Sequence, residues 1–133
     1  MTVKEFLAQY IDCELKIVSN QIKIFSMREN VENIALVFDD TPQMDSTANK
    51  VIDTYTKMEK EFFYETLRLK KIQKSVAVAI GSVTNPKQKA ILERCYLLGM
   101  SLSEAARDLG VSYQYAYALH SKALQQIEIP DTV

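Results

Sequence analysis

Residues 101–120 read SLSEAARDLGVSYQYAYALH and contain the signals for a helix, a tight turn and a second helix. Ser103 can cap the first helix, and Ala105 and Ala106 are small enough to let another helix approach closely. Gly110 can adopt the left-handed backbone conformation that a tight turn needs. Val111 can fill the turn with an apolar side chain, and the hydroxyl of Ser112 can cap the second helix. These residue types at these offsets predict a helix-turn-helix.

The predicted helix-turn-helix lies in a longer helical region that begins at Pro86. Proline suits the first position of a helix, and Asn85 or Thr84 can cap that helix. The chain continues as three helical phrases, KQKAILERCYLLG, SLSEAARDLG and VSYQYAYALHSKALQQI, of which the first two end at glycines. We therefore predict a tri-helical domain over residues 86–129, separated from the preceding chain by the break GSVTNP at 81–86.

Two long helical patterns occupy the first 80 residues. Both are apolar rows with steps of three and four residues: Val3, Phe6, Tyr10, Cys13, Ile17, Ile24, Met27 and Val31, then Val51, Tyr55, Met58, Phe62, Leu69, Ile72 and Val76. The polar, proline-containing stretch 38–45 interrupts the period, and Ser46 or Thr47 can cap the second helix. Long helices joined by a short connection predict an antiparallel, coiled-coil-like hairpin over residues 1–80, so the whole chain is expected to be all-α.

The first helix is apolar over a wider arc than a hairpin needs. A second row lies beside the first one: Leu7, Ile11, Val18, Ile22 and Phe25. A helix with so wide an apolar face needs more than one neighbour, so we expect copies of the chain to pair through the N-terminal helices as a homodimer. Asn20 and Glu65 interrupt the two main rows. Each of them either fixes the register or oligomeric state or lies at a solvated helix end.

The composition is that of a folded helical chain. The 133 residues include three glycines and three prolines, and 47% of them are hydrophobic and 25% charged. No apolar run is long enough to span a bilayer, and the start MTVKEFLAQYIDCELK carries acids where a secretory signal would be basic and then apolar. We therefore expect a cytoplasmic protein with no membrane contact.

Residues that commonly carry catalysis or bind metals are sparse. Cys13 and Cys95 lack CxxC spacing and have apolar helical neighbours, so buried, reduced thiols are expected. His120 is expected to contact phosphate or to lie at the edge of the core, and the pair Asp39 and Asp40 reads as a solvated turn. There is no glycine-rich phosphate loop and no ligand set at metal spacing. We expect neither an enzyme nor a cofactor nor a bound metal.

Residues 86–127 resemble region four of bacterial sigma factors and related phage regulators, through the stretches ILERCYLLGMSLSEAARDLGVS and ALHSKAL. The full layout, a helical hairpin with a polar, proline-containing loop before the helix-turn-helix, is similar to small phage and prophage proteins of unassigned function and to ArpU and RinA type late-gene regulators. The resemblance implies a sequence-specific transcriptional regulator of phage or prophage genes in a bacterial host cell. It also implies double-stranded DNA as a partner, with RNA polymerase as a second one.

The helix that follows Ser112 is the predicted recognition helix. If Ala116, Leu119 and Ala123 or Leu124 face the core, the residues that look outward are Tyr113, Gln114, Tyr115, Tyr117, Ala118 and Ser121. By resemblance, Tyr113, Gln114, Tyr117 and Ala118 match the positions that meet promoter bases, and Lys122 lies nearer the phosphates. Glutamine can pair with adenine, and tyrosine can offer its hydroxyl to phosphate or its ring to a thymine methyl group.

We therefore predict base contacts from Tyr113, Gln114 and Tyr117. Phosphate contacts are predicted from Ser112, Tyr115, Lys122 and Arg107.

The charge of this region is balanced. Residues 86–133 hold five basic side chains (Lys87, Lys89, Arg94, Arg107, Lys122) and five acidic ones (Glu93, Glu104, Asp108, Glu128, Asp131). Most DNA-binding modules are clearly basic, so one copy is expected to bind weakly unless a dimer or RNA polymerase holds it in place. Two other classes stay open. One is a small-terminase-like packaging protein, and the other is a protein-interaction module that binds a host factor through exposed tyrosines.

Overall fold

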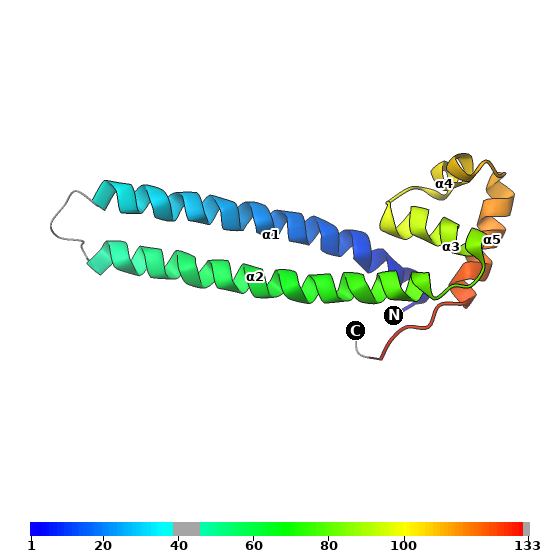
Figure 1. Cartoon of the computed structure of the whole chain (residues 1–133), viewed down its shortest axis with the longest axis horizontal. Coiled ribbons are helices and arrows are strands. Elements are labelled where there is room, and N and C mark those ends of the chain that lie inside the picture. Colours follow the sequence, from blue (N-terminus) through cyan, green and yellow to red (C-terminus); the bar gives the residue numbers. More distant parts are fainter. Residues whose placement is uncertain (39–45, 132–133) are drawn as a thin grey trace. The chain divides into compact units, whose positions relative to one another are not determined.

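The computed structural model describes residues 1–38 and 46–131, and every regular element in these ranges is helical (Figure 1). The elements are α1 (Val3–Phe38), α2 (Ser46–Gly81), α3 (Pro86–Leu92), the π-helix η1 (Glu93–Leu97), α4 (Leu102–Leu109) and α5 (Tyr113–Gln125). The all-α prediction is therefore confirmed. Within the described ranges, no helix combines the length and the apolar character needed to cross a membrane.

The predicted breaks agree with the observed helix ends. Helix α1 ends at Phe38 and α2 begins at Ser46, while α2 ends at Gly81 and α3 begins at Pro86. The connection itself, including Asp39 and Asp40, lies outside the described residues, as do the side chains of Ser46 and Thr47 that were predicted to cap α2.

The chain forms two compact units. The head unit consists of Met1–Glu14 and Lys70–Val133, and the hairpin unit consists of Leu15–Leu69. The head unit thus contains the first turns of α1 and the last turns of α2 together with all the C-terminal helices. The predicted division into residues 1–80 and 86–129 follows helix ends rather than compactness, and it stays a prediction.

In the hairpin unit, α1 and α2 run antiparallel and pack against each other. Arg28 on α1 donates to Glu59 on α2, with 2.7 Å between Nε and Oε1. Nearer the other end of the unit, the Lys23 ammonium lies over the Phe62 ring, 5.2 Å from its centroid. Ile17 is buried in the seam at 3% exposure, as the row of apolar residues predicted.

Asn20 is a polar residue inside this seam. Its side chain is 4% exposed, and its Nδ2 is buried and has no hydrogen-bond partner among the described residues. The alternative that placed Asn20 at a solvated helix end is therefore wrong, because Asn20 lies in the middle of α1. A role in fixing the register stays a prediction. A buried amide without a partner costs about 1–3 kcal/mol of stability.

Asn20→Leu is accordingly expected to raise the free energy of unfolding by about 1–2 kcal/mol, because it replaces an unsatisfied donor with an apolar group of similar size. Urea unfolding followed by circular dichroism measures the change. Asn30→Leu, at an exposed position of the same helix, is the matched control and should gain a few tenths of a kcal/mol from helix propensity. Destabilisation by Asn20→Leu would show that the amide has a partner that the hairpin needs.

In the head unit, one apolar cluster joins the ends of the long helices to the C-terminal helices. Phe6 and Leu7 of α1 are fully buried in it, together with residues of α2 to α5: Val76, Ile80, Ile91, Leu92, Ala105 and Ala116. Gln73 of α2 adds hydrogen bonds from Nε2 to the Tyr10 carbonyl (3.1 Å) and to Glu14 Oε2 (2.8 Å). The first part of the wide apolar face of α1 is thus covered by the chain itself.

Candidate nucleic-acid interface

The turn between α4 and α5 is closed by a left-handed glycine. Gly110 has φ +69°, and its N–H donates to the Arg107 carbonyl at 3.2 Å. The next N–H, that of Val111, donates to the Ala106 carbonyl at 3.0 Å, and the Val111 side chain packs against the core. The predicted roles of Gly110 and Val111 are therefore confirmed.

The cap of α4 differs from the prediction. Ser101, not Ser103, caps the helix: its Oγ accepts from the Glu104 N–H at 3.1 Å and donates to Glu104 Oε1 at 3.2 Å. Ser103 lies exposed within the first turn. The spacing Ser-x-x-Glu at 101–104 is the sequence signature of a capping box, and this signal identifies the correct serine.

Helix α5 is held at its start and along one face. Ser112 Oγ accepts from the Tyr115 N–H at 3.1 Å, as predicted for the cap. Ala116, Leu119 and Ala123 are buried, and both α3 and α4 pack against α5. Because alanines are buried on both α4 and α5, the backbones of these two helices can approach closely.

The opposite face of α5 is open. Tyr113, Gln114, Tyr115, Tyr117, Ala118 and Lys122 are exposed, as are Ser112 and Arg107, whereas Ser121 is half-buried. Gln114, Ala118 and Ser121 lie along the centre of this face because they are four and three residues apart. Tyr113 and Tyr115 are two residues apart, so they lie at opposite edges. DNA contact stays a prediction for all nine residues.

Lys87 is a candidate that sequence reasoning missed. Its ammonium lies 5.7 Å from the centroid of the Tyr115 ring, so α3 brings a cation to the start of α5. Two residues predicted to contact phosphate, Tyr115 and Ser112, lie in the same turn region. Lys87 and Tyr115 are 28 residues apart, so the sequence does not show that they are neighbours. The sequence does place Lys87 at the start of a helix, just after Pro86.

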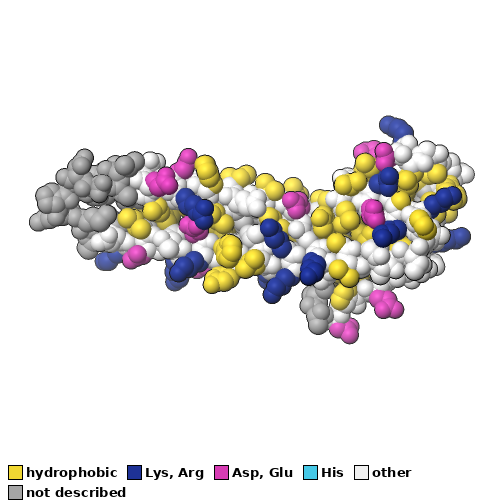
Figure 2. All heavy atoms as spheres, viewed as in Figure 1, with side chains coloured by type: hydrophobic (Ala, Val, Ile, Leu, Met, Phe, Trp, Pro, Cys, Tyr) yellow, Lys and Arg dark blue, Asp and Glu magenta, His cyan; other side chains and the backbone are white. Residues whose placement is uncertain are grey.

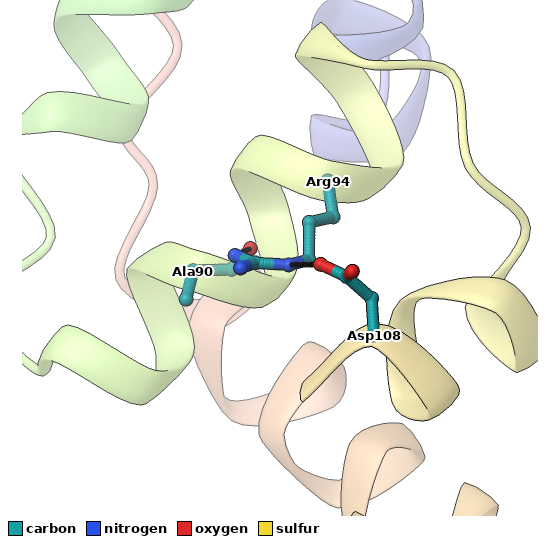
Figure 3. Close-up of polar contacts among 3 residues, drawn as sticks. All are labelled: Ala90, Arg94 and Asp108. Carbon is teal, nitrogen blue, oxygen red and sulfur yellow. Dashed lines mark hydrogen bonds and ion pairs between the residues drawn. The ribbon is translucent and has the colours of Figure 1, made fainter. Parts of the chain in front are cut away.

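Arg94 is engaged within the unit (Figure 3). Its Nε donates to Asp108 Oδ2 at 2.6 Å, and its Nη1 donates to the Ala90 carbonyl at 3.2 Å. This pair ties η1 to α4 and neutralises one cation of the region. Three of the remaining basic residues are exposed: Lys87, Arg107 and Lys122.

His120 lies on the inner side of α5. Its Nε2 is 2.7 Å from the Tyr96 hydroxyl of η1, and the two rings stack at 5.6 Å. With 8% exposure it is unable to meet phosphate, so that alternative is wrong and the place at the core edge is confirmed. Burial, and then the charge of Lys4, lower the pKa of His120, while burial, followed by Cys95, raises the pKa of Tyr96 to about 12. The shifts therefore favour a neutral imidazole and a protonated phenol in the folded chain, and a hydrogen bond joins His120 Nε2 to the Tyr96 hydroxyl.

The lowered pKa of His120 predicts that the folded chain loses stability in mild acid. The pKa of His120 is lower in the folded state than the value near 6.5 of the unfolded chain, so the unfolded chain takes up the proton first as the pH falls. The contribution is complete above pH 6.5, declines below it, and stops declining below the folded pKa. Urea unfolding from pH 8 to pH 5 should show a steeper decline for the wild type than for His120→Gln. Parallel profiles would contradict the assignment.

Neither cysteine suggests a metal site. Cys13 is buried, as predicted, but Cys95 is half-buried, and burial raises the pKa of its thiol. A raised pKa keeps the sulfur as the less reactive thiol. In the part of the chain that the structure describes, no three side chains of His, Cys, Asp or Glu gather as metal ligands would.

Comparison with known proteins bears on the C-terminal third of the chain. No curated protein and no solved structure matches the chain. Residues 84–128 match the family model described as Sigma-70, region 4. This segment contains α3, η1, α4 and α5, and thus the turn at Gly110 and the open face of α5. The match supports a DNA-binding regulatory role for the chain, carried by a region similar to sigma region 4.

Proposed function

We propose that this protein is a sequence-specific transcriptional regulator of phage or prophage genes, not an enzyme, and that it acts in the cytoplasm of a bacterial host. It binds double-stranded DNA through α5, and it is held at its site either by pairing with a second copy through its N-terminal helices or by RNA polymerase. The observation that carries the proposal is the open face of α5, which follows a capped, glycine-closed turn in the segment that matches sigma region 4.

Residues at the centre of the open face are the ones proposed to contact bases. A recognition helix presents its first turns to the floor of the major groove. Gln114 lies there and can pair with both N6 and N7 of an adenine, whereas tyrosines at the edges reach the walls of the groove. Lys87, Arg107 and Lys122 are the exposed cations that meet phosphates. Three such contacts predict a slope of about −3 for the logarithm of affinity against the logarithm of salt concentration, per head unit.

Selection of bound sequences from a random double-stranded DNA pool, at low and near-physiological salt, tests this function. We expect a defined motif for the wild type, and Gln114→Ala should weaken binding to it about 10- to 100-fold by losing the adenine contact. Gln125→Ala is the matched control. It changes the same residue type eleven positions later, which places it about 16 Å further along the helix, and it should retain the motif.

A transcription assay tests the regulatory part. Bacterial RNA polymerase on a template that carries the selected motif should give a changed amount of transcript with the wild type and an unchanged amount with Gln114→Ala. Strong DNA binding without any enriched motif would overturn sequence-specific regulation in favour of a packaging protein. Absence of DNA binding at both salt concentrations, with or without RNA polymerase, would favour a module that binds a host protein through its tyrosines.

A further inference from the structure

The outer face of α1 carries an apolar stripe with the spacing of a coiled coil. Leu7, Ile11, Leu15, Val18, Ile22 and Phe25 follow one another at steps of four, four, three, four and three residues. The first two are covered in the head unit: Leu7 is fully buried, and Ile11 Cδ1 is 3.7 Å from the position that a Cβ on Gly99 would take. The last four belong to the hairpin unit, and we call them the outer stripe.

The outer stripe is exposed although it is apolar. Leu15, Val18, Ile22 and Phe25 are 64%, 44%, 64% and 65% exposed, because a second helix covers one face of α1 and these residues lie on the other. Figure 2 shows apolar side chains on the surface of both long helices. The nearby charge of Lys23 is directed away from the stripe, over the Phe62 ring of α2.

We propose that the outer stripe is the surface on which a second copy of this chain docks, with the two α1 helices antiparallel about a two-fold axis. The pairing of two copies is already part of the proposed function, and this inference rests on that function. It adds the surface and the direction of the pairing. A stripe with heptad spacing fits a helix with the same spacing, and a two-fold axis supplies that helix from an identical chain.

The area of the outer stripe agrees with this partner. Its exposed side chains amount to roughly 450 Å², within the ~300–600 Å² range of the largest apolar patch on a protein surface, a patch that often has a function. Two copies would cover about 900 Å² from these eight side chains, so flanking residues need to add about 100 Å² or more to reach the ~1,000 Å² of a specific interface.

The antiparallel direction follows from shape and charge. It pairs Leu15 with Phe25 and Val18 with Ile22 of the other copy, so all four layers combine a smaller with a larger side chain. Along one edge of the stripe, Glu14, Gln21 and Arg28 occupy the same heptad position. Antiparallel pairing sets Glu14 of one copy near Arg28 of the other, and Gln21 near its own equivalent. Arg28 also pairs with Glu59 and keeps 66% of its side chain exposed, which leaves donors free for a second carboxylate. Glu14 is exposed and uses Oε2 to accept from Gln73, so Oε1 is the atom that would meet Arg28.

The first test measures the oligomeric state of the full-length protein by sedimentation. No DNA is present, so the result does not depend on whether the protein binds DNA. The wild type should be a dimer at micromolar concentration, and Ile22→Glu should be a monomer of unchanged helix content. Leu67→Glu, at an exposed position of α2 in the same unit, is the control and should stay dimeric. A monomeric wild type, or a dimer that tolerates Ile22→Glu, would overturn the proposal.

The second test determines the direction of pairing by mild oxidation and non-reducing electrophoresis. Gln21→Cys should give a covalent dimer, because this position meets its equivalent across the two-fold axis. Arg28→Cys should not cross-link, since its equivalent lies two helical turns or more away, and the wild type controls for Cys13 and Cys95. Cross-linking of Arg28→Cys as readily as Gln21→Cys, which a parallel pair would give, would overturn the antiparallel geometry.

A third measurement links the surface to DNA. With two joined head units, affinity for DNA that carries two copies of the selected motif should exceed that for one copy by about 100-fold or more. Ile22→Glu should remove this advantage and leave binding to a single motif unchanged. An equal loss of affinity for the one-motif and the two-motif DNA would contradict the assignment of pairing and DNA binding to two different surfaces.

Discussion

Phe6→Ala is expected to lower the free energy of unfolding of the head unit by about 3–5 kcal/mol, although Phe6 lies 80 residues before Pro86, where the C-terminal helices begin. The side chain is fully buried, in the same apolar cluster as Ile91 of α3 and Ala116 of α5. Its removal leaves a cavity between the ends of the long helices and the C-terminal helices. Because folded domains are stable by about 5–15 kcal/mol, this loss is a large part of the total.

Urea unfolding followed by circular dichroism measures this effect, and DNA binding should weaken in parallel as the folded fraction falls. Phe63→Ala is the matched control, because Phe63 is 54% exposed on α2 and its truncation should cost less than about 1 kcal/mol. Equal stabilities of the two variants would show that the C-terminal helices fold without the first turns of α1. A fragment that begins at residue 84 lacks Phe6, Leu7, Val76 and Ile80, so we expect it to be unstable.

This dependence on α1 shows where sequence reasoning reached its limit. The wide apolar face of α1 predicted more than one neighbour, and both the hairpin seam and the head unit are such neighbours. The pattern along one helix does not say which residues cover which part, because that depends on contacts between distant segments. Leu7 and Val18 belong to the same predicted row, yet the first is fully buried and the second is 44% exposed.

Local signals predicted the helix-turn-helix more completely. Pro86, Gly110 and Ser112 act through their own backbone and their nearest neighbours, so their residue types determine where helices begin and end. His120 was also accessible to such reasoning, because it lies on the face of Ala116 and Ala123, four residues after one and three before the other. The approach of Lys87 to Tyr115 and the pairing of Arg94 with Asp108 join different helices, and they required the structure.

Two aspartates placed two residues apart on α5 should both weaken DNA binding, but only one of them should disturb folding. Ala116→Asp puts a carboxylate at a fully buried position in the apolar cluster, and an uncompensated buried charge costs about 3–5 kcal/mol or more. We expect thermal unfolding at a much lower temperature and loss of DNA binding as a consequence. Ala118 is exposed at the centre of the open face, so Ala118→Asp should cost less than about 1 kcal/mol through helix propensity.

The Ala118→Asp variant should nonetheless bind DNA at least about 10-fold more weakly, because its carboxylate faces the negative potential of the duplex. Thermal unfolding and a binding assay on the selected motif, run on both variants, separate the two causes of lost binding. A stable Ala118→Asp that binds the motif as tightly as the wild type would exclude this face of α5 as the DNA interface. A stable variant with weakened binding assigns the loss to the interface itself, since Ala118 is exposed on the open face.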